Sequence, residues 1–129
     1  MSKAAVLDAS ALLCLLNGES GSERVLEALP SAVIGAANLA EVVSKLRERG
    51  LSVEEVGDVL GSLPLDVRAL NASQAYKIGH LRPTTRSSGL SLGDRACLAL
   101  AAELGMPALT ADQAWAGLDI GVAVELIRG

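Results

Sequence analysis

The sequence predicts an α/β protein with three layers, α/β/α, around a central, mainly parallel sheet of about five strands. Short apolar runs alternate with longer segments of helical periodicity, as in strands joined by crossover helices. Half of the 129 residues are apolar, yet Tyr76 and Trp115 are the only aromatic ones. A core of Ala, Val, Leu and Ile suits helices packed on a buried parallel sheet. This length fits a single domain over 1–129.

Five apolar runs are the predicted strands. They cover residues 4–7, 32–34, 65–67, 108–110 and 122–126. Helices are expected between them, at 9–16, 20–29, 39–50, 52–61, 72–81 and 94–104. Capping-box patterns begin two of these helices, at Ser20 with Glu23 and at Ser52 with Glu55. Residues 82–91 contain no apolar period and no acid, which predicts a loop.

Four acidic residues are placed where this sheet would bind a ligand. Asp8 ends the first strand, and Asp112 lies two residues past the fourth. Glu41 is early in the helix after the second strand, and Asp94 is at the start of the helix that follows the loop. Parallel α/β sheets bind ligands beyond the carboxyl ends of their strands. We therefore expect all four carboxylates at one edge of the sheet.

Clustered carboxylates repel one another, and a divalent cation relieves that repulsion. Carboxylate and water oxygens are the ligands that Mg²⁺ and Mn²⁺ favour. The formal net charge of −4 argues against binding nucleic acid through bulk positive charge, but four such acids account for it. Taken singly, the three aspartates could be helix caps or turn residues, and Glu41 could lie on an exposed face.

The sequence offers no zinc site and no Cys or His nucleophile as a competing chemistry. His80 has no partner at metal-ligand spacing and is expected on the surface near a helix end. Cys14 and Cys97 lie in apolar runs and are interpreted as buried thiols in a reducing compartment.

No apolar run reaches the ~18 residues of a membrane span, so the expected location is the cytoplasm.

Four segments together resemble the motifs of PIN-domain ribonucleases, specifically toxins of the VapC type. They are Val6–Leu13 (VLDASALL), Asn38–Val42 (NLAEV), Leu90–Ala99 (LSLGDRACLA) and Thr110–Asp112 with the following Trp115. The order matches, and the resemblance runs from Val6 to about Arg128. It places Asp8, Glu41, Asp94 and Asp112 at the acidic positions of the family, with Ser10 and Thr110 as supporting hydroxyls. Asp119 is the nearest candidate for a further acid, although a turn residue is the more ordinary interpretation.

The resemblance implies a metal-dependent endoribonuclease that serves as the toxin of a toxin–antitoxin pair. Mg²⁺ or Mn²⁺ would be the cofactor, and hydrolysis would leave 5′-phosphate and 3′-hydroxyl ends. The implied partners are RNA, a cognate antitoxin and a second copy in a homodimer. Asp8 and Asp94 are the expected direct metal ligands, while Glu41 and Asp112 could also act through water. Because chemistry of this type does not use the 2′-hydroxyl, RNA would be selected by shape and sugar contacts.

Arg82, Arg86 and Arg95 surround the third motif and are the candidates for RNA phosphate contacts. For the first two, simple solvation in a loop is an equal alternative. Two other functions remain open. One is a non-catalytic PIN-like module that binds RNA or protein. The other is an aspartate-based phosphohydrolase, which is disfavoured because Ser10 stands where that chemistry needs a second aspartate.

Overall fold

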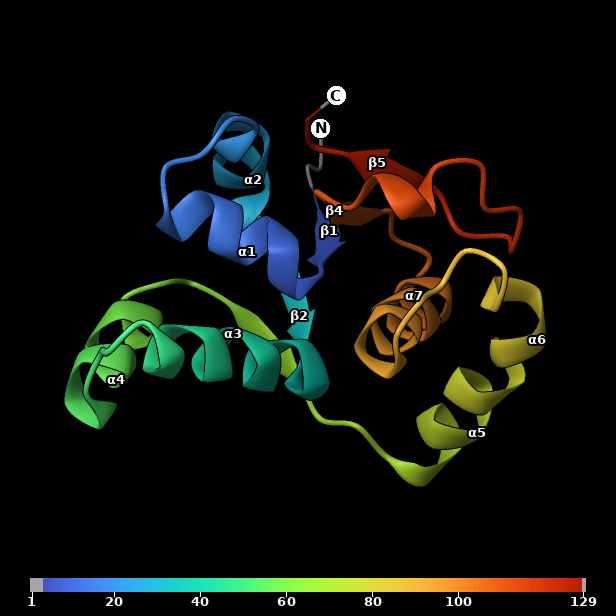
Figure 1. Ribbon diagram of the computed structural model, residues 1–129, viewed down its shortest axis with the longest axis horizontal. Coiled ribbons are helices and arrows are strands. Elements are labelled where there is room, and N and C mark those ends of the chain that lie inside the picture. Colours follow the sequence, from blue (N-terminus) through green and yellow to red (C-terminus); the bar gives the residue numbers. More distant parts are fainter. Residues whose placement is uncertain (1–3, 129) are drawn as a thin grey trace.

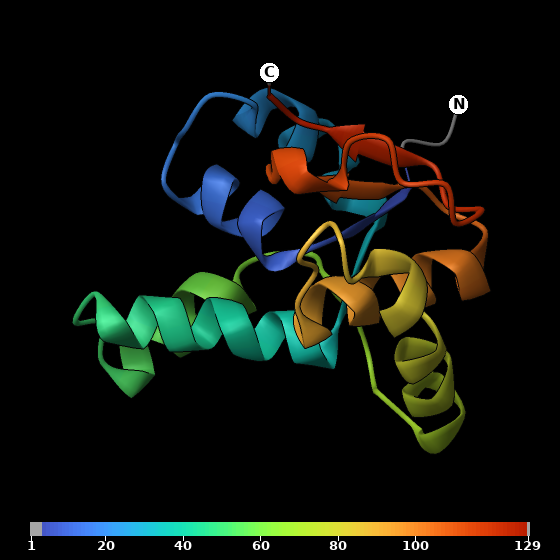
Figure 2. The same cartoon turned by 45° about the vertical axis from the view of Figure 1, so that its right-hand side comes forward.

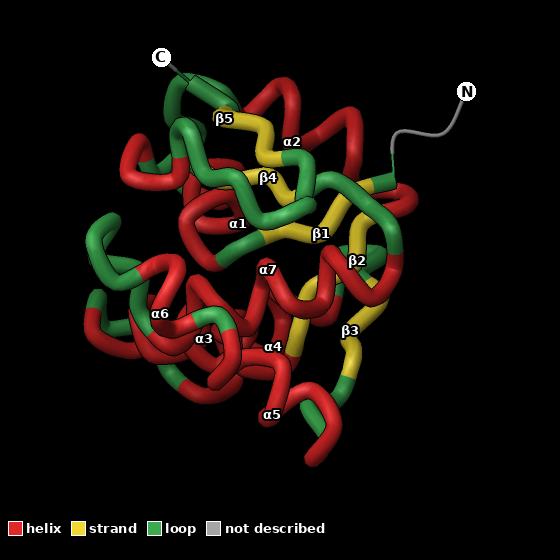
Figure 3. The backbone as a smooth tube through the Cα atoms, turned by 90° about the vertical axis from the view of Figure 1, so that its right-hand side faces the viewer, coloured by secondary structure: helices red, strands yellow, loops and turns green. Residues whose placement is uncertain are grey.

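The central sheet has five parallel strands, as predicted. The computed structural model describes residues 4–128, and its strands lie side by side in the order β3-β2-β1-β4-β5 (Figure 3). The strands are β1 (Ala5–Leu7), β2 (Ala32–Gly35), β3 (Asp66–Arg68), β4 (Ala108–Thr110) and β5 (Val124–Leu126). β1 is central, so the residue that follows it lies at the middle of the carboxyl edge.

Helices cover both faces of the sheet (Figures 1 and 2). They are α1 (Ala9–Leu16), α2 (Ser22–Ala28), α3 (Ala36–Glu48), α4 (Val53–Gly61), α5 (Ala72–His80), α6 (Arg82–Thr85) and α7 (Leu92–Leu104). Two 3₁₀ turns, η1 (Leu29–Ser31) and η2 (Gln113–Trp115), complete the described elements. No helix in residues 4–128 is long and apolar enough to cross a membrane.

The two layers of core follow from the alternation of side chains along β1. Leu7 packs with Leu12 and Val42, in the core between the sheet and helices α1, α2 and α3. Val6 points to the other face and packs with Leu98 and Trp115, under α7 and η2. All six side chains are buried. The core on each face fixes α1, α3 and α7 against β1 and β2. Glu41 lies in α3 and Asp94 in α7, while Asp8 directly precedes α1.

Two local predictions are wrong. The Ser20–Glu23 capping box does not form: α2 begins after Gly21, which has φ of 99° and provides no side-chain cap. That left-handed φ favours glycine. The stretch 82–91 is not all loop, since Arg82–Thr85 form α6. Pro83 in the first turn has a φ suited to a helix, and the Thr85 hydroxyl donates to the carbonyl of Leu81 at 2.7 Å.

Several smaller predictions are confirmed. Cys14 and Cys97 are buried free thiols, and His80 is exposed at the end of α5. The Ser52–Glu55 capping box forms at α4.

Candidate active site

Asp8 is the buried acid at the carboxyl edge of the sheet. Only 3% of the surface of Asp8 is exposed to solvent. Oδ1 accepts the Ala11 amide at 2.8 Å, which caps α1, and the Ser10 hydroxyl donates to the same carboxylate at 2.8 and 2.9 Å. From β4, the Thr110 hydroxyl donates to Oδ2 at 2.5 Å. The capping role expected as an alternative is therefore real, and it serves to fix this carboxylate.

Burial makes the Asp8 carboxylate hard to ionise. Its pKa rises from 3.8 to about 6, chiefly because burial removes water from the charged form. Hydrogen bonds from Thr110, Ala11 and Ser10 counteract part of this rise, while the charge of Asp94 adds to it. A cation beside Asp8 would lower this pKa and stabilise the charged carboxylate.

Glu41 reaches the same edge from α3 and is held by a buried asparagine. The Asn38 amide donates at 3.0 Å both to Glu41 Oε1 and to the carbonyl of Gly93, the second residue of α7. Asn38 is 1% exposed. Figure 2 shows the start of α3 (teal) meeting the start of α7 (amber), where this bridge lies. The pKa of Glu41 is raised, first by burial and also by the charge of Asp94.

Gly93 leaves room for the Glu41 carboxylate. A Cβ on Gly93 would lie 2.4 Å from Glu41 Oε1 and 2.7 Å from Cδ. Any other residue at this position would therefore push the carboxylate away from its place.

Asp94 and Asp112 are each oriented by one carboxylate oxygen. Asp94 Oδ2 accepts the Ser91 amide at 2.8 Å, and Ser91 Oγ accepts the Asp94 amide at 3.1 Å, which completes a capping box on α7. Asp112 Oδ1 accepts the Ala114 amide at 2.9 Å and caps η2. Among the described contacts, the other oxygen of each carboxylate takes no hydrogen bond within the chain. It is therefore the oxygen left to bind a ligand.

One cleft of about 210 Å³ brings the four predicted acids together. Its lining consists of Asp8, Ala9, Ser10, Leu13, Glu41, Lys45, Asp94 and Asp112. Within residues 4–128, no three His, Cys, Asp or Glu side chains stand close enough to hold an ion in their present positions. The acids thus share a cleft without already forming a closed coordination shell.

The residues present nevertheless fit a hard divalent cation. The cleft offers carboxylate and hydroxyl oxygens and no histidine or thiol, which is the donor chemistry of Mg²⁺ or Mn²⁺. Asp8 and Glu41 both have raised pKa values, and the charge of Asp94 contributes to each. A cation in the cleft would relieve that repulsion.

The supporting hydroxyls lie where the sequence placed them. Besides contacting Asp8, Ser10 Oγ accepts the amide of Ala111 at 2.9 Å, and Thr110 Oγ1 accepts the amide of Asp112 at 3.0 Å. The two hydroxyls therefore connect Asp8 on β1 with the segment that carries Asp112 after β4.

Asp119 and the three arginines are not brought to the cleft. None of them is in its lining. Arg95 instead donates from Nη1 to the carbonyl of Ile78 at the end of α5, at 3.1 Å. Arg82 and Arg86 are exposed at the two ends of α6. Their role in phosphate binding remains a prediction.

Three residues around the site were not predicted from the sequence: Asn38, Lys45 and Ser91. A signal existed for each. Asn38 and Glu41 are three residues apart, Glu41 and Lys45 four apart, and Ser91 and Asp94 three apart, which are the spacings of neighbours on a helix and of a capping box.

This fold and site define a class: a parallel α/β/α domain with four carboxylates in one cleft at the carboxyl edge of its sheet. The PIN domain family model matches residues 5–120, and the chain belongs to the PIN-domain family.

Relatives and solved structures agree with this assignment. The chain is 32% identical over 114 residues to VapC ribonuclease Mb2780c of Mycobacterium bovis and to Ribonuclease VapC42 of Mycobacterium tuberculosis, covering 81% of this chain and 87% of each relative. The fold is similar to that of a toxin–antitoxin complex from Klebsiella pneumoniae, with a TM-score of 0.75, 21% identity and coverage of 95% and 97% of the two chains. It is also similar to DNA-bound VapBC from Salmonella typhimurium, with a TM-score of 0.73, 20% identity and coverage of 98% and 99%.

Proposed function

We propose that this chain is a metal-dependent endoribonuclease that acts as the toxin of a toxin–antitoxin pair. The observation that carries the proposal is the convergence of Asp8, Glu41, Asp94 and Asp112 on one cleft. The VapC ribonucleases, with which the chain shares 32% identity over most of its length, support RNA as the substrate.

Asp8 and Asp94 are the proposed direct ligands of Mg²⁺ or Mn²⁺, with Glu41 and Asp112 completing the acidic set. When bound, such an ion supplies positive charge that polarises a phosphodiester and eases deprotonation of water. Ser10 and Thr110 hold the Asp8 carboxylate in a single orientation. Asn38 holds Glu41 at the rim of the cleft, where its carboxylate can orient water or accept a proton.

The proposed reaction is hydrolysis that leaves a 5′-phosphate and a 3′-hydroxyl. Purified protein would be incubated with RNA, and the new ends tested by ligation that requires a 5′-phosphate. Ligatable 5′ ends are expected. Cyclic-phosphate or 5′-hydroxyl ends would contradict this chemistry, since they arise from attack by the neighbouring 2′-hydroxyl.

The proposed partners are a cognate antitoxin and a second copy of this chain. Solved structures of similar fold include toxin–antitoxin complexes. The acidic cleft suits inhibition by a basic side chain of the antitoxin, which would pair with the carboxylates. Light scattering of the isolated chain tests the homodimer, and inhibition of cleavage by the purified neighbouring gene product tests the antitoxin.

A further inference from the structure

Lys45 is the one basic side chain that lines the carboxylate cleft, within the part of the chain that the structure describes. It follows Glu41 by four residues on α3, so both lie on the same face of that helix. One helical turn, about 6 Å along the axis, separates their positions. Lys45 therefore lines the cleft one helical turn from Glu41.

Lys45 makes only a weak ion pair with its neighbour on α3. Its amino group is 3.8 Å from Glu48, and the two side chains are 59% and 69% exposed, so this ion pair holds the lysine weakly. The charge instead acts on the cleft, where it lowers the pKa of Glu41 against the larger effect of burial.

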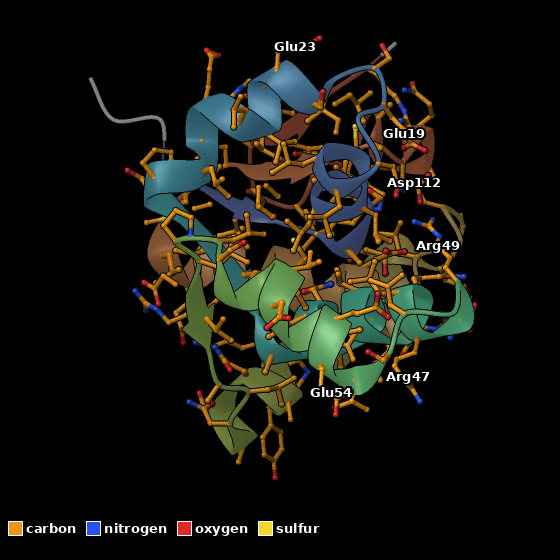
Figure 4. The ribbon with its side chains drawn as sticks, turned by 90° about the vertical axis from the view of Figure 1, so that its left-hand side faces the viewer. Glu19, Glu23, Arg47, Arg49, Glu54 and Asp112 are labelled. Atoms are coloured by element: carbon orange, nitrogen blue, oxygen red, sulfur yellow. The ribbon has the colours of Figure 1, made fainter. Side chains whose placement is uncertain are left out.

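The neighbouring arginines at the C-terminal end of α3, one in its last turn and one capping it, are occupied elsewhere. Arg47 donates to the carbonyl of Leu51, and Arg49 donates to Asn17 Oδ1 at the end of α1. Figure 4 shows Arg47 directed away from Asp112, with Arg49 between them on the same side of the molecule. Lys45 is thus the cation of α3 that both borders the cleft and remains free to bind an anion.

We propose that Lys45 binds an RNA phosphate next to the one that enters the carboxylate cleft. This inference rests on the proposed function. An RNA strand carries one negative charge per nucleotide, and four carboxylates repel it, so a cation beside them favours its approach. A flexible ammonium suits a phosphate as a point charge. No aromatic side chain lines the cleft, which leaves the sugar–phosphate backbone as the feature to be recognised there.

Steady-state cleavage of a labelled single-stranded oligoribonucleotide in Mn²⁺, at several KCl concentrations, tests the proposal. Lys45→Ala should raise KM by about 3- to 10-fold at low salt with kcat within about twofold. The plot of log(kcat/KM) against log[KCl] should become shallower by about 0.7, the value of one phosphate contact on a single strand. Lys45→Arg should retain the salt dependence. Lys77→Ala is the matched control, because Lys77 is 51% exposed and pairs with Glu103 away from the cleft.

The outcomes separate this inference from the proposed function. Wild-type protein that cleaves no RNA overturns both. Wild-type cleavage with an unchanged KM and salt slope in Lys45→Ala overturns the inference alone. A variant that changes only the Mn²⁺ concentration needed for activity, with the same salt slope, also overturns it, since Lys45 would then act on the carboxylates rather than on RNA.

Discussion

At the scale of residues, the fold holds acidic side chains of the site in surroundings that disfavour their charged form. Asp8 shows this most clearly, because its carboxylate is buried and its pKa is raised to about 6. A carboxyl whose pKa rises from 3.8 to about 6 on folding costs roughly 3 kcal/mol of stability at neutral pH. The fold tolerates this cost at the position where the proposed cation binds.

Replacing Asp8 should therefore stabilise the metal-free protein. Between about pH 4 and pH 6 the folded state keeps a proton that the unfolded state has lost, so stability falls as pH rises through this range. In chelator, Asp8→Asn should equal or trail the wild type near pH 4 and exceed it by ~1–3 kcal/mol at pH 7.5. Urea unfolding at both pH values measures this difference. An Asp8→Asn protein less stable than the wild type at pH 7.5 would show that Asp8 serves mainly as a hydrogen-bonding centre.

Gly93 provides a second prediction at this scale. In Gly93→Ala, the new Cβ would displace the Glu41 carboxylate, and misplacement of such a group by about 1 Å should lower cleavage by roughly 10- to 100-fold. Gly57→Ala is the control, because nothing lies within 4 Å of a Cβ there and alanine favours the α4 helix by about 0.5–1 kcal/mol. Equal cleavage by the two variants would contradict a role for the Glu41 carboxylate in the reaction.

At the scale of elements, the start of α7 couples helix capping to the position of Asp94. Ser91 and Ser52 form the same kind of capping box, on α7 and α4 respectively. Alanine at either position should lower the free energy of unfolding by about 1 kcal/mol. Only Ser91→Ala should also reduce kcat/KM, since only its partner is a site acid. Thermal melts and cleavage kinetics on the two variants check this, and equal kinetics would contradict a role for the α7 cap in the site.

The strand pattern predicted the sheet and its acidic edge because parallel strands end together, which places Asp8 and Asp112 from sequence order alone. The contacts of side chains on the helices could not be predicted in the same way. Whether Asn38 reaches Gly93 depends on how α3 packs on α7, and local periodicity does not fix that packing. The same limit explains Arg95, whose guanidinium turns to the end of α5 although its sequence neighbour Asp94 lines the cleft.

At the scale of the whole molecule, the ends of β1 and β4 and the helices α3 and α7 bring four acids from separate segments to one cleft, so metal binding should stabilise the entire fold. An ion that binds only the native state adds about 2.7 kcal/mol at one hundred times its Kd, which corresponds to a Tm increase of roughly 8 °C for a domain of this size. The increase should shrink below about pH 5 as the carboxylates take up protons. Differential scanning fluorimetry with and without Mn²⁺ measures it, and an unchanged Tm at neutral pH would count against a shared metal site.

The proposed activity of this carboxylate cleft is the cleavage of RNA with the help of a divalent ion. The most direct measurement compares wild type and Asp8→Asn, each purified free of partner proteins, on total cellular RNA in Mg²⁺, in Mn²⁺ and in chelator, with the new 5′ ends mapped. We expect discrete cuts that require the metal and disappear in Asp8→Asn. Folded wild-type protein that cuts nothing under any of these conditions, or an Asp8→Asn variant that cuts equally well, would contradict the proposed activity and favour a module that binds RNA or protein without catalysis.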